Sequence, residues 1–158
     1  MQTLDTLAMA DAFAAKIMAI VPSFEPLRSI GWHHVDAVRI RRLGGQAELA
    51  SKGTRHFALL FTLAQPSYTW MGGIGTAYRL RLAVATTYDI ADLSMLSHML
   101  TADAVDLRLA LNQLRDPTLP GLVNVEPAGS ANESVDDVGN VYFEHVFTVD
   151  YHQATTAA

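Results

Sequence analysis

The side chains best suited to chemistry in this chain are its six histidines, because it contains no cysteine. Imidazole nitrogens bind transition metals and exchange protons near neutral pH. His33 and His34 are adjacent, so on a strand they would point to opposite faces. The others are scattered, without HxH or HExxH spacing: His56, His98, His145 and His152. Local spacing therefore predicts no metal and no cofactor, and leaves open only a site assembled in three dimensions.

His145 lies on the apolar face of the last expected strand. A histidine in that setting is usually hydrogen-bonded, either in the core or at a sheet edge. The sequence contains neither a Ser-His-Asp signature nor a GxSxG turn. We therefore expect that the protein is not an enzyme.

The run Gly72-Gly73-Ile74-Gly75 has the composition of a phosphate-binding loop. In dinucleotide and P-loop sites the glycines lead into the N-terminus of a helix. This run instead precedes an expected strand, so we interpret it as a source of flexibility in a contact loop.

Two pairs of arginines alternate with apolar residues: Arg39 with Arg41, and Arg79 with Arg81. Such cations could contact phosphate, but the net charge is −5 and no aromatic residues interleave the first pair. Two partners fit them: the acidic groups of a neighbouring subunit, or DNA that passes through a channel.

The elements that position these residues must fit one domain, since 158 residues can build a single sizeable core. Half of the residues are hydrophobic, which predicts a folded chain. The charged fraction of 17% is below the usual quarter, which suggests a surface partly covered by partners. Neither a secretory signal nor a membrane-spanning segment is recognisable, so we expect a soluble protein without a membrane partner.

Charge is distributed unevenly along the chain. Residues 1–88 hold nine basic and five acidic residues, a net +4, whereas residues 89–158 hold two and eleven, a net −9. If the halves interleave, these charges mix on the surface. If they form separate faces, copies of the chain could associate head to tail.

Residues 1–20 are predicted to form an amphipathic helix, because apolar residues recur at spacings of four, four and three: Met9, Phe13, Ile17 and Ile20. A first strand is expected over 35–43, where Val38 and Ile40 alternate with the arginines of the first pair.

Residues 54–88 predict a long hairpin, around which the rest of the chain is organised. The first arm is apolar on both faces, as in a buried strand, and the second alternates with a period of two. The connecting loop, 65–75, is too long for a tight turn and carries three large side chains: Tyr68, Trp70 and Met71. We expect this loop to be a contact surface.

Residues 91–115 show a leucine stripe at helical spacing, with Thr101 as the N-cap of a possible second start. A short strand is expected over 122–126. The stretch 127–139 is rich in Gly, Ser, Asn and Asp and is expected to be an exposed, flexible loop.

The chain ends on an alternating strand, 141–151, and a tail, 152–158, that has little to anchor it. The order is therefore helix, three strands, helix, two strands, within one domain spanning 1–158. We predict an α+β fold, with a mostly antiparallel sheet of about five strands and helices packed on one face.

This order of elements resembles the tail-terminator, or tail-completion, proteins of long-tailed bacteriophages. The features that carry the resemblance are the amphipathic opening helix, the long hairpin with the extended loop 65–75, the helix after Tyr88-Asp-Ile, and the closing strand Val141-Tyr-Phe-Glu-His-Val-Phe-Thr-Val-Asp-Tyr151. In that family such a closing strand follows a flexible acidic loop.

The resemblance implies a virion structural subunit of the tail or neck that is assembled in the host cytoplasm. Copies would form a homo-oligomeric ring, a hexamer in that family, that caps the tail tube, ends tail polymerisation and provides the joint to the head. The implied partners are other copies, the tail tube protein, the connector or neck protein, and DNA in the lumen. The family has no catalytic residues to transfer.

The interface residues that we predict come from this sequence alone: Tyr68, Trp70, Met71, Arg39, Arg41, Arg79 and Arg81. Two alternatives stay open. One is another neck or head-completion protein. The other, from a different class, is a small ligand-binding or metal-dependent enzyme domain that uses the sheet and His56 or His145.

Overall fold

The structure is a computed structural model that describes residues 4–24, 31–36, 40, 55–62, 65–70, 75–89, 93–115, 117–135 and 140–152. The described elements, in chain order, are α1 (Thr6–Met18), β1 (Trp32–His34), β2 (Arg55–Phe61), β3 (Gln65–Trp70), β4 (Gly75–Asp89), the 3-10 turn η3 (Leu93–Met95), α3 (Leu96–Asn112), β5 (Leu122–Val135) and β6 (Asn140–His152).

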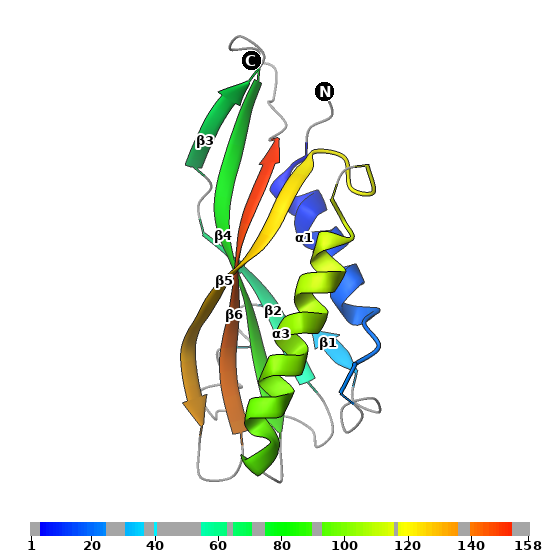
Figure 1. Cartoon of the computed structure of the whole chain (residues 1–158), viewed down its shortest axis with the longest axis vertical. Coiled ribbons are helices and arrows are strands. Elements are labelled where there is room, and N and C mark those ends of the chain that lie inside the picture. Colours follow the sequence, from blue (N-terminus) through cyan, green and yellow to red (C-terminus); the bar gives the residue numbers. More distant parts are fainter. Residues whose placement is uncertain are drawn as a thin grey trace.

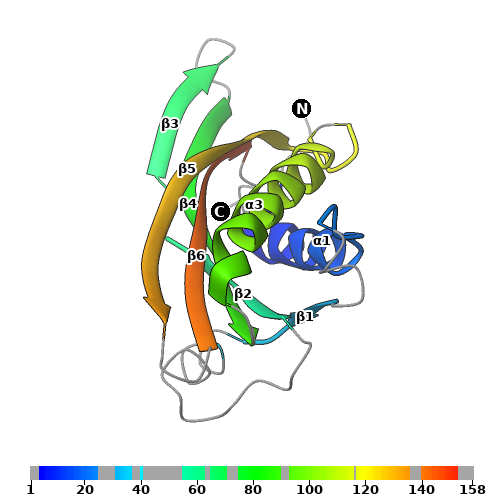
Figure 2. The same cartoon turned by 60° about the horizontal axis from the view of Figure 1, so that its bottom comes forward.

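The strands form a single six-stranded sheet in the order β1-β2-β4-β6-β5, and β3 also pairs with β4. Every pairing is antiparallel except that of β1 with β2. Both α1 and α3 lie against one face of this sheet (Figures 1 and 2). The predicted α+β class is confirmed, with six strands where about five were expected.

Helix α1 lies within the predicted residues 1–20 and begins at a side-chain cap. The carboxylate of Asp5 accepts a hydrogen bond from the backbone N–H of Ala8 at 2.7 Å. This bond satisfies one of the N–H groups that have no partner within the helix at its first turn. The apolar stripe then turns Met9, Phe13 and Ile17 into the core, where each is fully buried.

We expect the substitution Asp5→Ala to lower the free energy of unfolding by about 1 kcal/mol, since it removes this cap. Urea unfolding followed by circular dichroism would measure the change. Asp11 is an exposed acid in the same helix and does not cap it, so Asp11→Ala should stay within about 0.5 kcal/mol of the parent. Equal losses in the two variants would contradict the assignment.

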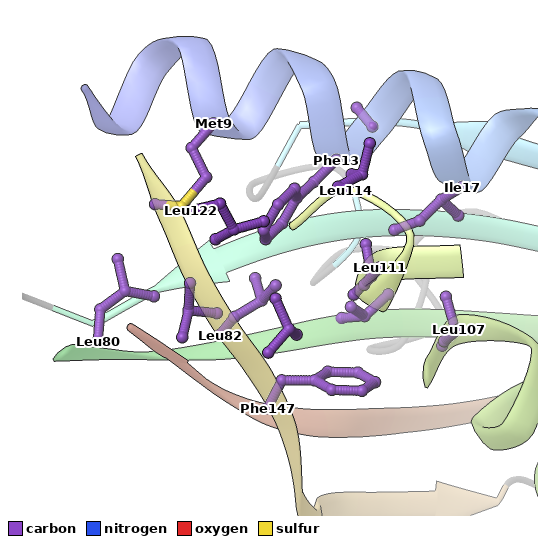
Figure 3. Packing of buried hydrophobic residues seen from close by; sticks show 14 of the residues in the cluster. Met9, Phe13, Ile17, Leu80, Leu82, Leu107, Leu111, Leu114, Leu122 and Phe147 are labelled. Carbon is purple, nitrogen blue, oxygen red and sulfur yellow. The ribbon is translucent and has the colours of Figure 1, made fainter. Parts of the chain in front are cut away.

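The core lies between the two helices and the sheet (Figure 3). Helix α1 contributes three of the labelled side chains, helix α3 and the turn after it contribute Leu107, Leu111 and Leu114, and the strands supply the remainder: Leu80, Leu82, Leu122 and Phe147. Because successive residues of a strand alternate between faces, the strand residues of this cluster define the helix-covered face of the sheet. The opposite side is called here the outer face.

The predicted hairpin is observed as β2 against β4, in an unbroken register from Arg55↔Tyr88 to Phe61↔Leu82. Phe57 lies on the helix-covered face, and Ala58 lies on the outer face beneath Ile40. The first arm was predicted to be apolar on both faces, and the structure shows why: both faces of β2 are covered.

The prediction that the first strand spans 35–43 was wrong. The strand is β1, Trp32–His34, which lies earlier than the predicted 35–43. Ile40 is helical instead, and its N–H donates to the carbonyl of Asp36, four residues earlier, at 3.1 Å. The alternation around Ile40 was too short to separate a strand from a helical turn. Arg39 and Arg41 fall outside the described residues.

Helix α3 runs without a break through Thr101, whose hydroxyl donates to the carbonyl of Ser97 at 2.8 Å. Thr101 is therefore an interior helix residue, not an N-cap. This back-bond to the preceding turn satisfies the hydroxyl, so the residue does not need to end the helix.

Strand β5 is much longer than the predicted 122–126, because residues 127–135 continue it. Its pairing with β6 is interrupted by three register shifts, and Gly129 adopts a positive φ of 98°. The polar residues that suggested a loop are those of an exposed edge strand with bulges, a form that discourages pairing with other chains. The prediction of a flexible loop was therefore wrong over 127–135. Residues 136–139 lie outside the described part.

Candidate assembly arm and buried polar network

Strand β3 and residues 75–79 of β4, which pair with each other, form a segment that we call the arm. Residues 77–79 of β4 also pair with β6 on their other side, so only 75–76 pair with β3 alone. The sequence predicted a loop over 65–75, but 65–70 pair with β4 from Gln65↔Arg79 to Trp70↔Gly75. Figures 1 and 2 show β3 standing clear of both helices, at the side of β4 away from them. Strand β3 therefore lies away from the helices, whereas its partner segment in β4 contributes to the core: Ala77 is fully buried and Tyr78 packs against the core cluster.

The pairing of β3 with β4 is irregular. Pro66 pairs with Tyr78, and the register shifts between Pro66 and Tyr68. Proline has no N–H to donate to a neighbouring strand, so within sheets it occurs on edge strands and at bulges. The position of Pro66 agrees with this rule. Within the described residues, β3 pairs with β4 and with no other strand.

The base of the arm is tied to β6 by an ion pair on the outer face. The Arg79 guanidinium donates from Nε to Asp150 Oδ1 at 2.8 Å and from Nη2 to Oδ2 at 3.2 Å. The hydrogen bonds that Arg79 donates to Asp150, together with the negative charge of that carboxylate, raise the pKa of Arg79 above its usual value. Because the Arg79 side chain is 60% exposed, water screens this pair, which orients the arm more than it stabilises the fold.

The structure places the predicted interface residues as follows. Tyr68 and Trp70 belong to β3, while Met71 lies outside the described residues. Arg79 and Arg81 share the outer face of β4, as expected, and both are exposed. Arg79 already has an acidic partner in its own chain, so its contact with a neighbour's acid stays a prediction. Arg81 is the more available cation of the two.

A buried polar network lies at the opposite end of β4 from the arm. Arg55 of β2 forms an ion pair with Asp103 of α3, and their side chains are 1% and 0% exposed. The other Asp103 oxygen accepts from the Tyr88 hydroxyl at 2.8 Å, and that hydroxyl lies 3.1 Å from Nε2 of His145. The Arg55 guanidinium also lies 4.1 Å from the ring centre of Trp32, a cation–π contact.

The hydrogen bonds in this network have a defined direction. Tyr88 has one proton, and it donates that proton to Asp103. His145 must therefore donate its Nε2 proton to the Tyr88 oxygen, which sets its neutral tautomer. The chain of donors runs from His145 through Tyr88 to Asp103, where the Arg55 charge balances the carboxylate.

Burial sets the titration of these groups. Burial first, and the positive Arg55 second, lower the pKa of His145 to about 4. Burial, with the negative Asp103 added, raises the pKa of Tyr88 well above its usual value. The pKa of Asp103 is also raised by burial, although Arg55 and the hydrogen bonds oppose that effect. At neutral pH the histidine is thus neutral and the tyrosine protonated.

This network joins β2, β4, β6 and α3, but it offers no accessible reacting group. The expected role of His145 as a hydrogen-bonded core histidine agrees with its 3% exposure. Sequence reasoning missed Asp103, which lies two residues after the Thr101 that was interpreted as a possible second helix start. The spacing of Met99, Asp103 and Asp106 along the buried stripe of α3 was the pattern that could have indicated it.

The histidines are distributed over both faces of the sheet. His145 lies on the helix-covered face, whereas His56 lies on the outer face beside His33. In the described part of the chain, no group of three or more His, Asp or Glu side chains is placed to hold a metal ion. A shallow pocket of about 470 Å³ opens between the end of α3 and β5, and neither His56 nor His145 lines it.

No protein-family model matches this chain, and no curated protein matches it significantly. Among the described residues, none of the helices is both long enough and apolar enough to cross a membrane.

Proposed function

We propose that this protein is a phage tail terminator: a virion structural subunit that assembles into a ring on the tail tube, ends tail polymerisation and joins the tail to the head. The ring is a homohexamer assembled in the host cytoplasm. Its partners are neighbouring copies, the tail tube protein and the connector or neck protein, and its lumen admits DNA. The subunit has no catalytic role.

The observation that supports this proposal most is the arm. Among the described strands, β3 pairs with β4 alone, and a strand at the end of a sheet is suited to contact a neighbour, because its backbone groups can pair with another chain. Pro66 and the adjacent bulge limit indiscriminate edge pairing, so a specific docked contact is favoured over open-ended growth.

A second support is the pairing within the arm base. Arg79 and Asp150 hold the arm on the sheet, while the exposed Arg81, two residues further along the same strand face, is left for an acid of a neighbour or for DNA phosphate. Head-to-tail contacts between copies use two different surfaces of each subunit and close into rings when the rotation permits.

The substitution Trp70→Ala tests the proposal. We expect the variant to keep the parent's thermal midpoint within a few degrees, because β3 stands clear of both helices. We also expect it to lose at least tenfold in ring formation measured by mass photometry. Leu109→Ala is the control, since Leu109 is 59% exposed on α3. A parent chain that stays monomeric and does not bind tail tubes would overturn the proposal.

The nearest alternative is another neck or head-completion protein, and electron microscopy of particles lacking this chain distinguishes the two. Overlong tails indicate a terminator, because tube growth then continues unchecked. Leaking or tailless heads indicate a component on the head side. A ligand-binding or enzymatic role would instead appear as a ligand-induced rise in melting temperature without self-assembly.

A further inference from the structure

His33 and His56 are brought together by the one parallel pairing in the described sheet. The register aligns His33 of β1 with His56 of β2, so their side chains project from the same outer face. The two ring centres are 5.9 Å apart, with the planes tilted by 39°. His33 is exposed and His56 is half-buried, so solvent reaches the pair from the side of the edge strand β1.

This separation matches two imidazoles on one metal ion. Metal–nitrogen bonds of about 2.0–2.1 Å place each ring centre about 3.2 Å from the ion. Two such rings are then about 5.2 Å apart at a tetrahedral angle and about 6.4 Å apart when opposite each other. The observed distance lies between these limits.

A third polar group lies in the same cross-strand row. Thr87 of β4 is aligned with His56, and its side chain is on the outer face. The residue is 3% exposed, and its hydroxyl has no hydrogen-bond partner among the described residues. A hydroxyl in this position can bond to a ligating imidazole or to a metal-bound water, as groups around metal ligands commonly do.

We propose that His33 and His56 form a two-histidine site for a divalent transition-metal ion, independent of the tail-terminator role. Two protein nitrogens leave the remaining coordination positions to water or to a ligand from outside. Neutral imidazoles suit Cu²⁺, Ni²⁺ and Zn²⁺, and the general order of stability predicts that Cu²⁺ binds most tightly. No carboxylate is required, so hard ions such as Mg²⁺ and Ca²⁺ should not bind there.

The bound ion would stabilise the pairing of β1 with β2. β1 has three residues and pairs with β2 alone among the described strands, so it is held by few hydrogen bonds. An ion that ligates both strands binds the folded state in preference to the unfolded chain. It should therefore raise the melting temperature in a concentration-dependent way.

The test uses the full chain without an affinity tag, titrated separately with Cu²⁺, Ni²⁺, Zn²⁺ and Mg²⁺ by calorimetry. We expect one Cu²⁺ per chain, weaker Ni²⁺ and Zn²⁺ binding, and no heat with Mg²⁺. His33→Ala and His56→Ala should each lose at least tenfold in affinity. Electron paramagnetic resonance of the Cu²⁺ complex should show two nitrogen ligands.

His34→Ala is the matched control, since His34 is the next residue along and contacts the Phe57 ring on the opposite face. This variant should bind Cu²⁺ as the parent does. Because His33 is exposed, His33→Ala is expected to fold, which circular dichroism can verify. The proposal is overturned if His33→Ala binds as tightly as the parent, if His34→Ala loses as much, or if the parent does not bind Cu²⁺ or Ni²⁺ below about 1 mM.

Discussion

Replacing Asp103 with alanine should lower the free energy of unfolding by about 3–5 kcal/mol, the largest effect that we expect of a single substitution in this protein. The change leaves the Arg55 guanidinium, 1% exposed, without its carboxylate partner. An unpaired charge that is shielded from water destabilises the folded state, because the surrounding protein solvates it poorly. Tyr88 suffers less, since its hydroxyl can turn and donate to His145 if that ring changes tautomer.

Urea unfolding of Asp103→Ala measures this loss, and Asp106→Ala is its control. Asp106 lies one turn further along α3, is also buried, and accepts a single hydrogen bond from the Ser23 N–H at 3.0 Å. Its loss should cost about 0.5–1.5 kcal/mol, the usual net contribution of a hydrogen bond, because Ser23 is exposed and water can satisfy its N–H. A loss in Asp103→Ala no greater than that in Asp106→Ala would contradict the buried ion pair.

The double variant Arg55→Met with Asp103→Leu should recover most of the stability, because it removes both charges together. Replacing a buried ion pair with apolar side chains of similar volume is often neutral or stabilising. The difference between this variant and the sum of the single variants measures the coupling of the pair directly. Failure of the double variant to recover would mean that Arg55 has a further role through Trp32.

Acidification from pH 6.5 to pH 4 should destabilise the protein through His145. The pKa of this residue is about 4 in the folded protein, against 6.5 for an ordinary histidine. Between these values the unfolded chain binds the proton and the folded protein does not, so stability is lost as the pH falls. The contribution of His145 is about 3 kcal/mol over that range.

A comparison of the parent with His145→Gln isolates this effect, because glutamine does not titrate and can still donate to Tyr88. The parent should lose more stability on acidification than the variant, with the difference developing between pH 6.5 and 4. Asp103 has the opposite effect on stability at low pH. Its pKa is raised in the folded protein, so the folded state binds the proton more readily than the unfolded chain does. Parallel pH profiles of parent and variant would refute the assignment.

The network and the arm occupy opposite ends of β4, and this separation has a functional consequence. Tyr88 is near the end of the strand that meets α3, whereas Ala77 belongs to the arm. Substitutions in the network should therefore change stability, and those in the arm should change assembly. Under conditions in which Asp103→Ala remains folded, we expect its ring formation to match that of the parent.

Much of the architecture followed from local pattern. The 3.6-residue stripe that predicted a helix over 1–20 and the alternation of β4 and β6 are properties of neighbouring residues, and α1, β4 and β6 are observed there. The same alternation also predicted which side chains of β2 and β4 share a face of the sheet. The α+β class then followed from the order of the elements, because helices and a half-apolar sheet bury their apolar faces against each other.

Only the tertiary structure decided the roles of the polar residues. Whether the stretch 65–70 is loop or strand depends on its pairing with β4, a contact that its own composition does not encode. Asp103 is buried in the fold, because Arg55, 48 positions earlier, supplies the charge that makes its burial tolerable. His33 and His56 are 23 positions apart in the sequence and neighbours in the sheet. The sequence by itself determined where the apolar faces lie, since periodicity is local. Partners between distant polar groups depend on strand register and helix placement, which the packed core alone establishes.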